Sequence, residues 1–217
     1  MRSPQLIIGG VARPELMVLD FDIDAPEQKT NMVDVIGANG SVDLSTVLTD
    51  GNPVYNNRKA TFSLGVRSGA VTQRTLSAEL HGRIVGVSKT DEADGYLEGR
   101  VALSDFKPYP SGDFTFKLTI DAQPFWTANA EKSLSFNPAT GNGKNIMITN
   151  ANQKWAAPVV SVSGGVVDIV SAGTHFQIVD GAQKVIPGII LKSGDNAFTL
   201  IGAAAALVTF KWREGWL

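Results

Sequence analysis

The sequence predicts a mainly β protein with two parts: an N-terminal β-sandwich or barrel-like domain that carries one helix, and a small C-terminal β-sandwich domain. Three observations predict this class. Apolar and polar residues alternate through much of the chain, one stretch shows helical spacing instead, and a segment rich in Asn, Gly, Ala and Ser at 127–150 separates two β-rich regions. We therefore assign residues 1–130 to the first domain, 131–144 to a connector and 145–217 to the second domain.

Strands account for most of the chain on either side of the connector. Phe62, Leu64 and Val66 alternate with small or polar neighbours, and residues 114–120 repeat the pattern. A period of two turns one face of a strand toward a core and the other toward water. Further strands are predicted at 15–23, 83–88, 96–104, 158–162, 166–170, 175–179, 185–191, 197–201 and 207–212.

One helix and several tight turns interrupt these strands. Leu76, Leu80 and Ile84 are spaced four apart, which predicts a helix of two to three turns near 70–81. The loop at 90–95, with its Asp-Gly pair, predicts a hairpin between the strands on its two sides.

A second turn is predicted from glycine and a capping carboxylate. Gly37 and Gly40 bracket a turn that requires positive φ, and Asn39 before Gly40 is typical of a hairpin or tight turn. Asp43 is placed to cap a turn that begins at Leu44.

Composition excludes several classes of function. The chain has 217 residues with no cysteine, which excludes disulfides, thiolate zinc sites and iron–sulfur clusters. Nineteen basic residues against 21 acidic ones provide no basic field for a nucleic acid backbone. No apolar run approaches the ~20 residues of a membrane span, and the apolar run Leu6–Ile8 is too short for a secretory signal. We expect a soluble protein made in the cytoplasm, with no membrane contact.

The acidic residues do not form a recognisable catalytic or metal-binding motif. Asp20, Asp22 and Asp24 alternate, but a calcium loop starting there would have Ala25 and Asn31 where glycine and a carboxylate are needed. The alternation instead indicates the polar face of a strand. Three further carboxylates, Asp91, Glu92 and Asp94, share one hairpin loop rather than a cleft.

The remaining candidates for chemistry are histidines and tryptophans. His81 and His175 lack metal-ligand spacing, and there is no nucleophile elbow or phosphate-binding loop. We therefore predict a protein that is not an enzyme, with no metal and no cofactor. The four tryptophans lie in the second half of the chain. They either pack in a core or interface or, if exposed, form a platform that binds sugars. They are Trp126, Trp155, Trp212 and Trp216.

Several motifs follow one another in a set order along the chain, and together they resemble the distal tail protein family of long-tailed bacteriophages. The stretches in the first domain are APEQKTNMVDVIGANGSVDLSTVL at 25–48, YNNRKATFSLGV at 55–66, LHGRIVGV at 80–87, GYLEGRVAL at 95–103 and LTIDAQPFW at 118–126. Those in the second domain are APVVSVSG at 157–164, GDNAFTLIG at 194–202 and TFKWREGWL at 209–217.

The resemblance implies a structural virion protein of the tail tip. Its first domain would form a homohexameric ring around a DNA channel and join the tail tube to the baseplate. Its second domain would hold a tail-tip lysin or spike and receptor-binding proteins. We expect a neutral or acidic inner wall with no specific DNA binding. The residues expected to serve structure or interfaces are Gly37, Gly40, Asp43, Arg58, Gly99, Arg100, Pro124 and Trp126.

A second function stays open at this stage. The chain could instead be a carbohydrate-binding module that recognises host cell-wall glycans, which requires an exposed tryptophan or tyrosine platform on the second domain. Arg100, in contrast, is expected to point opposite to Val101 and to make a charge-assisted bond that fixes the first domain or its neighbour.

Overall fold

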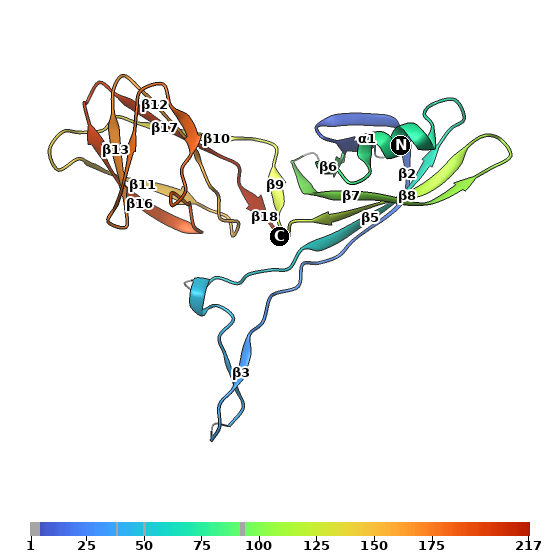
Figure 1. Cartoon of the computed structure of the whole chain (residues 1–217), viewed down its shortest axis with the longest axis horizontal. Coiled ribbons are helices and arrows are strands. Elements are labelled where there is room, and N and C mark those ends of the chain that lie inside the picture. Colours follow the sequence, from blue (N-terminus) through green and yellow to red (C-terminus); the bar gives the residue numbers. More distant parts are fainter. Residues whose placement is uncertain (1–4, 38, 50, 92–93) are drawn as a thin grey trace. The chain divides into compact units, whose positions relative to one another are not determined.

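The computed structural model describes residues 5–37, 39–49, 51–91 and 94–217 (Figure 1). The chain divides into two compact units, Met1–Trp126 together with Leu217, and Thr127–Trp216. We refer to them as the first and second unit and describe each by itself. The predicted mainly β class is confirmed, since one α-helix accompanies a large set of strands in the described part of the chain.

Among its described residues, the first unit contains eight strands before the boundary, with one α-helix and one short 3-10 helix. The strands are β1 (Gln5–Ile8), β2 (Val11–Ile23), β3 (Met32–Asp34), β4 (Ser41–Asp43), β5 (Arg58–Val66), β6 (Ile84–Lys89), β7 (Gly95–Pro108) and β8 (Phe114–Ala122). The helices are α1 (Gln73–Leu80) and η1 (Val47–Thr49), and the short strand β9 (Trp126–Ala128) lies at the boundary.

Six of these strands close into an antiparallel barrel. The order is β7-β6-β1-β2-β5-β8, and β8 pairs back with β7. A closed sheet has no free edge, so its backbone N–H and C=O groups pair within the chain. The alternating residues predicted from the sequence fill the interior, as Phe62 and Leu64 of β5 and Leu118 and Ile120 of β8 are fully or almost fully buried.

Helix α1 lies inside the range predicted for it. The Thr72 side chain accepts a hydrogen bond from the Thr75 N–H and so satisfies one free donor of the first turn. Leu76 and Leu80 pack into the barrel core, and Gly82, with φ of 79°, follows the helix end. The spacing of Leu76 and Leu80 was therefore a correct guide to the buried face, whereas Ile84, the third residue of the expected stripe, lies in β6 (Ile84–Lys89) and is exposed.

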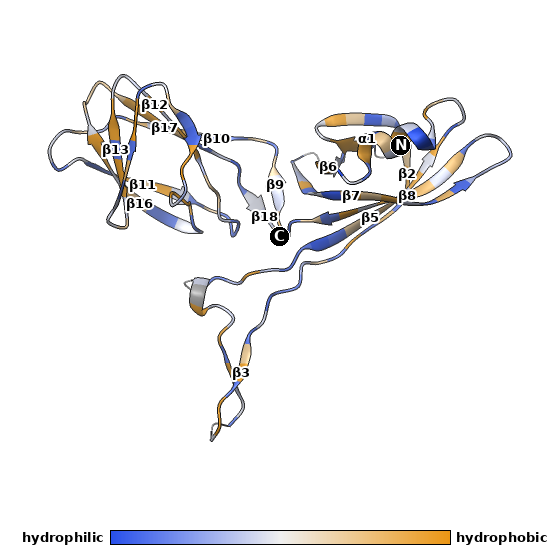
Figure 2. Cartoon of the chain, viewed as in Figure 1, coloured by the Kyte–Doolittle hydropathy of each residue, from blue (hydrophilic) through white to orange (hydrophobic). Residues whose placement is uncertain are grey.

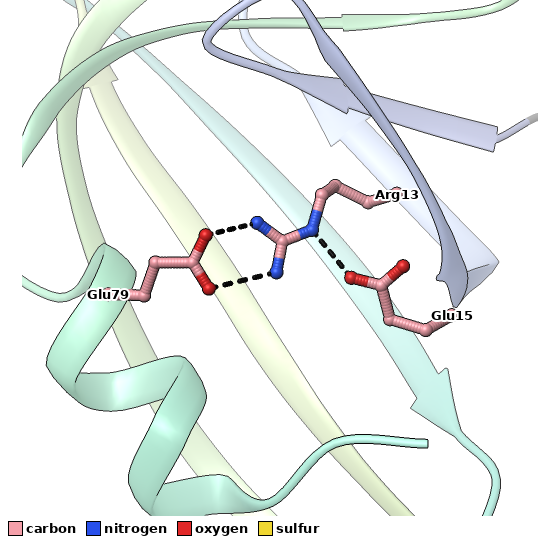
Figure 3. Close-up of polar contacts among 3 residues, drawn as sticks. All are labelled: Arg13, Glu15 and Glu79. Atoms are coloured by element: carbon pink, nitrogen blue, oxygen red, sulfur yellow. Dashed lines mark hydrogen bonds and ion pairs between the residues drawn. The ribbon is translucent and has the colours of Figure 1, made fainter.

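A bidentate ion pair fastens α1 to the barrel (Figure 3). Arg13 of β2 donates two hydrogen bonds to the Glu79 carboxylate, at 2.5 and 3.0 Å, and its Nε donates to Glu15 at 2.5 Å. The bond to Glu79 raises the pKa of Arg13, and in turn holds the pKa of Glu79 below its usual value. A fork-to-fork pair of this kind fixes orientation as well as proximity.

Between β2 and β5 the chain leaves the barrel and returns, and we call residues 24–57 the arm. It contains the two-stranded hairpin β3–β4 and the short helix η1 (Figure 1). The pairing joins Met32 to Asp43, Val33 to Val42 and Asp34 to Ser41. All six of these hairpin residues are exposed.

The second unit is a sandwich of two four-stranded sheets. One has the order β10-β17-β12-β15 and the other β11-β16-β13-β14. Side chains from both sheets pack in one core, where the ring centroids of Phe198 in β16 and Phe210 in β17 are 5.6 Å apart. Their strands are β10 (Lys132–Phe136), β11 (Lys144–Asn150), β12 (Val159–Ser163), β13 (Val167–Ser171), β14 (Thr174–Ile178), β15 (Gln183–Val185), β16 (Gly194–Gly202) and β17 (Leu207–Trp212). The short strand β18 (Gly215–Trp216) joins neither sheet and pairs with β9.

Two segments differ from the sequence assignments. Residues 131–144 were assigned to a connector, but they include β10, which pairs along its whole length with β17. The expected strand at 185–191 ends at Val185, where β15 ends. Pro187 lacks an N–H for a ladder, and Gly188 has φ of 99°, so the apolar side chains that follow enter the core from a turn.

Candidate assembly site

The β3–β4 hairpin presents an apolar face with no partner among the described residues. Val33 and Val42 face each other across the two strands, and they are 38% and 43% exposed. Because side chains alternate along a strand, Val35 and Leu44 fall on the same face, and both are exposed. Figure 2 shows this run of apolar residues along the arm. A two-stranded hairpin is only marginally stable unless something covers such a face.

The opposite face of the hairpin carries the polar residues Asp34, Ser41 and Asp43 beside the exposed Met32. Ser41 donates a hydrogen bond to Asp34 at 2.5 Å, and the Ser45 N–H donates to Asp43 at 2.8 Å. Hydrogen bonds from Ser45 hold the pKa of Asp43 below its usual value. The arm as a whole is acidic, since residues 24–57 contain five acidic residues and one basic residue. An acidic segment with one apolar side has the chemistry of a docking element.

A groove of about 370 Å³ is lined by residues of the first half of β2 and of the end of β5. Its lining includes Pro14 and Met17, the buried Leu16, and Gly65. A Cβ at Gly65 would meet the Met17 and Leu19 side chains at 3.5–3.6 Å, so these two exposed side chains lie over that backbone. We call this surface the β2 groove.

Two charged residues flank the β2 groove. The Glu15 carboxylate already accepts a hydrogen bond from Arg13. Arg67 is exposed, and no ion pair involving it occurs among the described residues. The β2 groove therefore combines exposed apolar surface with one cation, whose charge also acts on Asp113.

Three of the residues singled out from the sequence lie on the arm. Gly37 and Gly40 have φ of 87° and 81°, as expected for the turn that they bracket. Asp43 accepts from the backbone of Ser45, and η1 follows shortly after, in agreement with the capping role expected for this carboxylate. Their part in an interface is taken up below as a proposal.

Arg58 of β5 and Gly99 of β7 both pair with Ala122 of β8, which lies between these two strands. A Cβ at Gly99 would lie 2.2 Å from the Asp121 carbonyl oxygen, so only glycine fits there. Arg58 is 6% exposed, and its Nε and Nη2 atoms have no hydrogen-bond partner. Burial lowers the pKa of Arg58. This arginine stands where the arm joins the barrel.

The other expected residues are separate from this pair. Arg100 is exposed, Val101 beside it is buried, and Arg100 donates a hydrogen bond at 2.6 Å to the Gly82 carbonyl, so the bond lies within the first unit. Trp126 packs against the barrel core, and Pro124 is half-buried two residues before it. These residues support the barrel rather than forming one site with the arm.

The side chains with catalytic potential are dispersed. No three His, Asp or Glu residues gather as a metal site within the described ranges. His81 accepts a hydrogen bond from the Leu103 N–H, while His175 lies 2.5 Å from Asp168. Of the carboxylates in the 90–95 loop, Glu92 lies outside the described residues. In the parts of the chain with assigned positions, no helix has the length and apolar content to cross a bilayer.

The tryptophans divide between packing and exposure. Trp212 is buried in the second unit, and Trp126 packs in the first. Trp155 is 36% exposed, and the Lys192 ammonium lies 5.4 Å from its ring centroid. Trp216, in β18, is also exposed.

Sequence reasoning missed the two apolar surfaces. The alternation in Met32–Asp34 and Ser41–Asp43, with Asn-Gly between the strands, was a signal for the hairpin and its faces. The β2 groove had no such signal, because Gln5, Met17 and Gly65 are brought together only by the pairing of β1, β2 and β5.

The whole fold matches a solved phage protein. The SPP1 Dit (gp 19.1) protein, described as a paradigm of the hub adsorption apparatus in phages that infect Gram-positive bacteria, superposes with a TM-score of 0.65 over 100% of both chains. The two sequences are 12% identical. The chain shares the fold of this phage hub protein. The match agrees with the resemblance found in the motifs and with the predicted fold class. No family model and no curated protein sequence matches the chain.

Proposed function

We propose that this chain is a non-enzymatic structural protein of a phage tail tip, a ring-forming subunit that joins the tail tube to the baseplate. The observation that carries the proposal is the shared fold with SPP1 Dit along the entire length of both chains. A match that spans both units, rather than one common β module, supports a similar role for the whole protein.

The unpartnered arm supports assembly of several copies. An isolated subunit leaves the apolar face of β3–β4 in water, whereas a neighbouring protein surface would cover it. The arm and the β2 groove are different surfaces of one molecule. Contacts between different surfaces repeat from copy to copy and close into a ring when the rotation allows it.

The proposed partners follow from this role. The first unit forms the ring, which we take to be a hexamer with a channel for DNA and an inner wall that does not hold phosphates. The second unit holds other baseplate components, such as a lysin, a spike or receptor-binding proteins. The protein then belongs to the virion at the tail tip, after synthesis in the host cytoplasm.

The absolute mass of the full chain in solution tests the proposal. Light scattering after size exclusion should give a discrete species near six times the 23.1 kDa subunit. Negative-stain images of the same fraction should show rings with a central opening. A mass of one subunit at every concentration, with no rings, would overturn the ring proposal.

One observation favours glycan binding as a second candidate. The exposed Trp155 ring and the nearby Lys192 form a polar-edged aromatic surface on the second unit. Titration of cell-wall glycan fragments should then quench tryptophan fluorescence in the wild type but not in Trp155→Ala. Trp216→Ala, which alters the other exposed tryptophan, is the matched control. Equal responses from wild type and Trp155→Ala would remove this candidate.

A further inference from the structure

We propose that Asn39, in the turn of the β3–β4 hairpin, is a site of spontaneous deamidation, whereas the fold protects the same dipeptide at Asn142. The inference goes beyond the proposed tail-tip role and does not depend on it. The pair Asn-Gly occurs twice in the chain, at 39–40 and at 142–143. The two copies therefore share their chemistry and differ only in their surroundings.

The reaction joins the asparagine side chain to the backbone that follows it. The glycine N–H loses its proton, and its nitrogen attacks the side-chain amide carbon of the asparagine. A C–N bond forms, the bond to the side-chain nitrogen breaks, and ammonia leaves a cyclic imide. Water then opens the imide at either carbonyl and gives aspartate or isoaspartate. A following glycine favours the attack because it has no Cβ to hinder it and its backbone is unusually free.

The surroundings of Asn39 leave this reaction open. Asn39 and Gly40 are both exposed, and the Asn39 side chain makes no hydrogen bond among the described residues. Gly40 has φ of 81° and lies just outside the ladder, which ends at the pair of Asp34 and Ser41. A Cβ at Gly40 would meet nothing within 4 Å, so the imide has space to form.

The surroundings of Asn142 oppose the same reaction. Asn142 is exposed, but Gly143 is half-buried. A Cβ at Gly143 would lie 2.7 Å from the Ile201 side chain and 3.0 Å from the Leu200 carbonyl oxygen. The next residue, Lys144, begins β11 and pairs with Leu200 of β16. Closing the imide requires the backbone at Gly143 to move, and its packing against β16 resists that movement.

The product changes the arm and spares the barrel. It adds one negative charge to a segment that has five acidic residues and one basic residue. The isoaspartyl form also lengthens the main chain by one carbon beside Gly40, next to the start of β4. No residue of 24–57 belongs to the barrel core as the structure describes it. A subunit that waits unassembled therefore gains charge with time while its barrel stays folded.

Peptide mass spectrometry of the dispersed full-length subunit tests the inference. The protein is held in warm, mildly alkaline buffer, because the attacking nitrogen must lose its proton. The gain in mass from the exchange of NH2 for OH is then followed in the peptides that contain Asn39 and Asn142. The Asn39 peptide should convert faster by about tenfold or more, because a backbone held in a packed conformation resists distortion.

Two controls isolate the cause of the difference. In concentrated guanidinium chloride the folded surroundings are lost, so the two sites should convert at similar rates. Gly40→Ala places a Cβ beside the attacking nitrogen and should slow conversion at Asn39 by about tenfold or more, with Asn142 unchanged.

The outcomes separate this inference from the ring proposal. Equal rates at the two sites in the folded chain, or faster conversion at Asn142, would overturn the inference. A difference that persists in guanidinium chloride would also overturn it, because the flanking sequence rather than the fold would then be the cause. A full chain of single-subunit mass would overturn the ring and leave a fold-dependent difference between the two sites standing.

Discussion

The barrel and the arm are both antiparallel β structure, but the barrel buries its apolar side chains whereas the arm exposes them to solvent. In the barrel, closure of six strands buries Phe62, Leu64 and Leu118 and leaves no edge unpaired. In the arm, two strands leave Val33 and Val42 exposed. The difference shows that the barrel buries its apolar side chains within one chain, while the arm leaves them exposed, as the proposed contact with another surface would require.

The largest expected contrast comes from truncating one side chain in each region. Phe62→Ala removes a buried ring from the barrel core and should lower the free energy of unfolding by about 3–5 kcal/mol. Val33→Ala on the arm should change it by less than about 0.5 kcal/mol. Urea denaturation of the dispersed subunit, followed by circular dichroism, measures both. Equal losses would show that the arm is part of the barrel's cooperative core.

A glycine in each region sharpens the same comparison. Gly99→Ala forces a Cβ into the Asp121 carbonyl and should cost about 1–3 kcal/mol, with a lower melting temperature of the barrel. Gly37→Ala meets nothing within 4 Å but has positive φ, so its strain of about 1 kcal/mol should stay in the arm turn. Thermal melts of the two variants compare them. The account fails here if Gly37→Ala lowers the melting temperature as much as Gly99→Ala.

Two arginines compare the junction of arm and barrel, at Arg58, with the barrel itself, at Arg100. Arg58→Met removes a buried guanidinium whose Nε and Nη2 lack partners, so stability should stay equal or rise by about 1 kcal/mol. Arg100→Met removes a hydrogen bond to the Gly82 carbonyl and should cost about 0.5–1.5 kcal/mol. Denaturation midpoints measure both changes. A clear loss of stability in Arg58→Met would mean that its charge is satisfied in the folded subunit.

The smallest effect concerns pH. The bond from Arg13 lowers the pKa of Glu79 below its ordinary 4.5, so the folded state binds this proton less readily than the unfolded state. The ionised carboxylate therefore contributes stability above about pH 4.5, and that contribution is lost as pH falls through the lower folded value. Glu79 is largely exposed, so the contribution should be below about 1 kcal/mol.

Melting curves of wild type and Glu79→Gln between pH 3 and pH 7 measure this contribution. The two proteins should differ near neutral pH and converge in acid. Asp43 on the arm is the matched comparison, since Asp43→Asn should leave the barrel's acid sensitivity unchanged. A gap between wild type and Glu79→Gln that widens in acid would contradict the sign worked out above.

The sequence predicts the barrel and its helix well because their signals are local. The period of two in β5 and β8 and the leucine spacing in α1 each follow from which side chains must be buried. β10 falls in a segment interpreted as a connector with room for one strand, because it is short and mostly exposed, and its pairing with β17 comes only from the structure. The apolar run near Ile186 was taken for a strand because periodicity alone does not reveal the turn at Gly188.

Of the two surfaces of the candidate site, the sequence indicates the arm but not the β2 groove. Gly37, Gly40 and Asp43 predict the turns of the arm, because a turn depends on the conformation and hydrogen bonds of individual residues. The β2 groove depends on the register that sets Gln5 beside Met17 and Met17 beside Gly65. Register between distant strands is a property of the closed barrel, and so this surface is found only from the structure.

Amide hydrogen exchange of the arm tests most directly the claim that a neighbouring copy covers it. The measurement compares peptides from 32–34 and 41–43 with peptides from β8, in the assembled particle and in the dispersed subunit. The account predicts fast exchange of the arm in the subunit and slow exchange in the particle, with β8 slow in both. Arm peptides that exchange equally fast in both forms would contradict it.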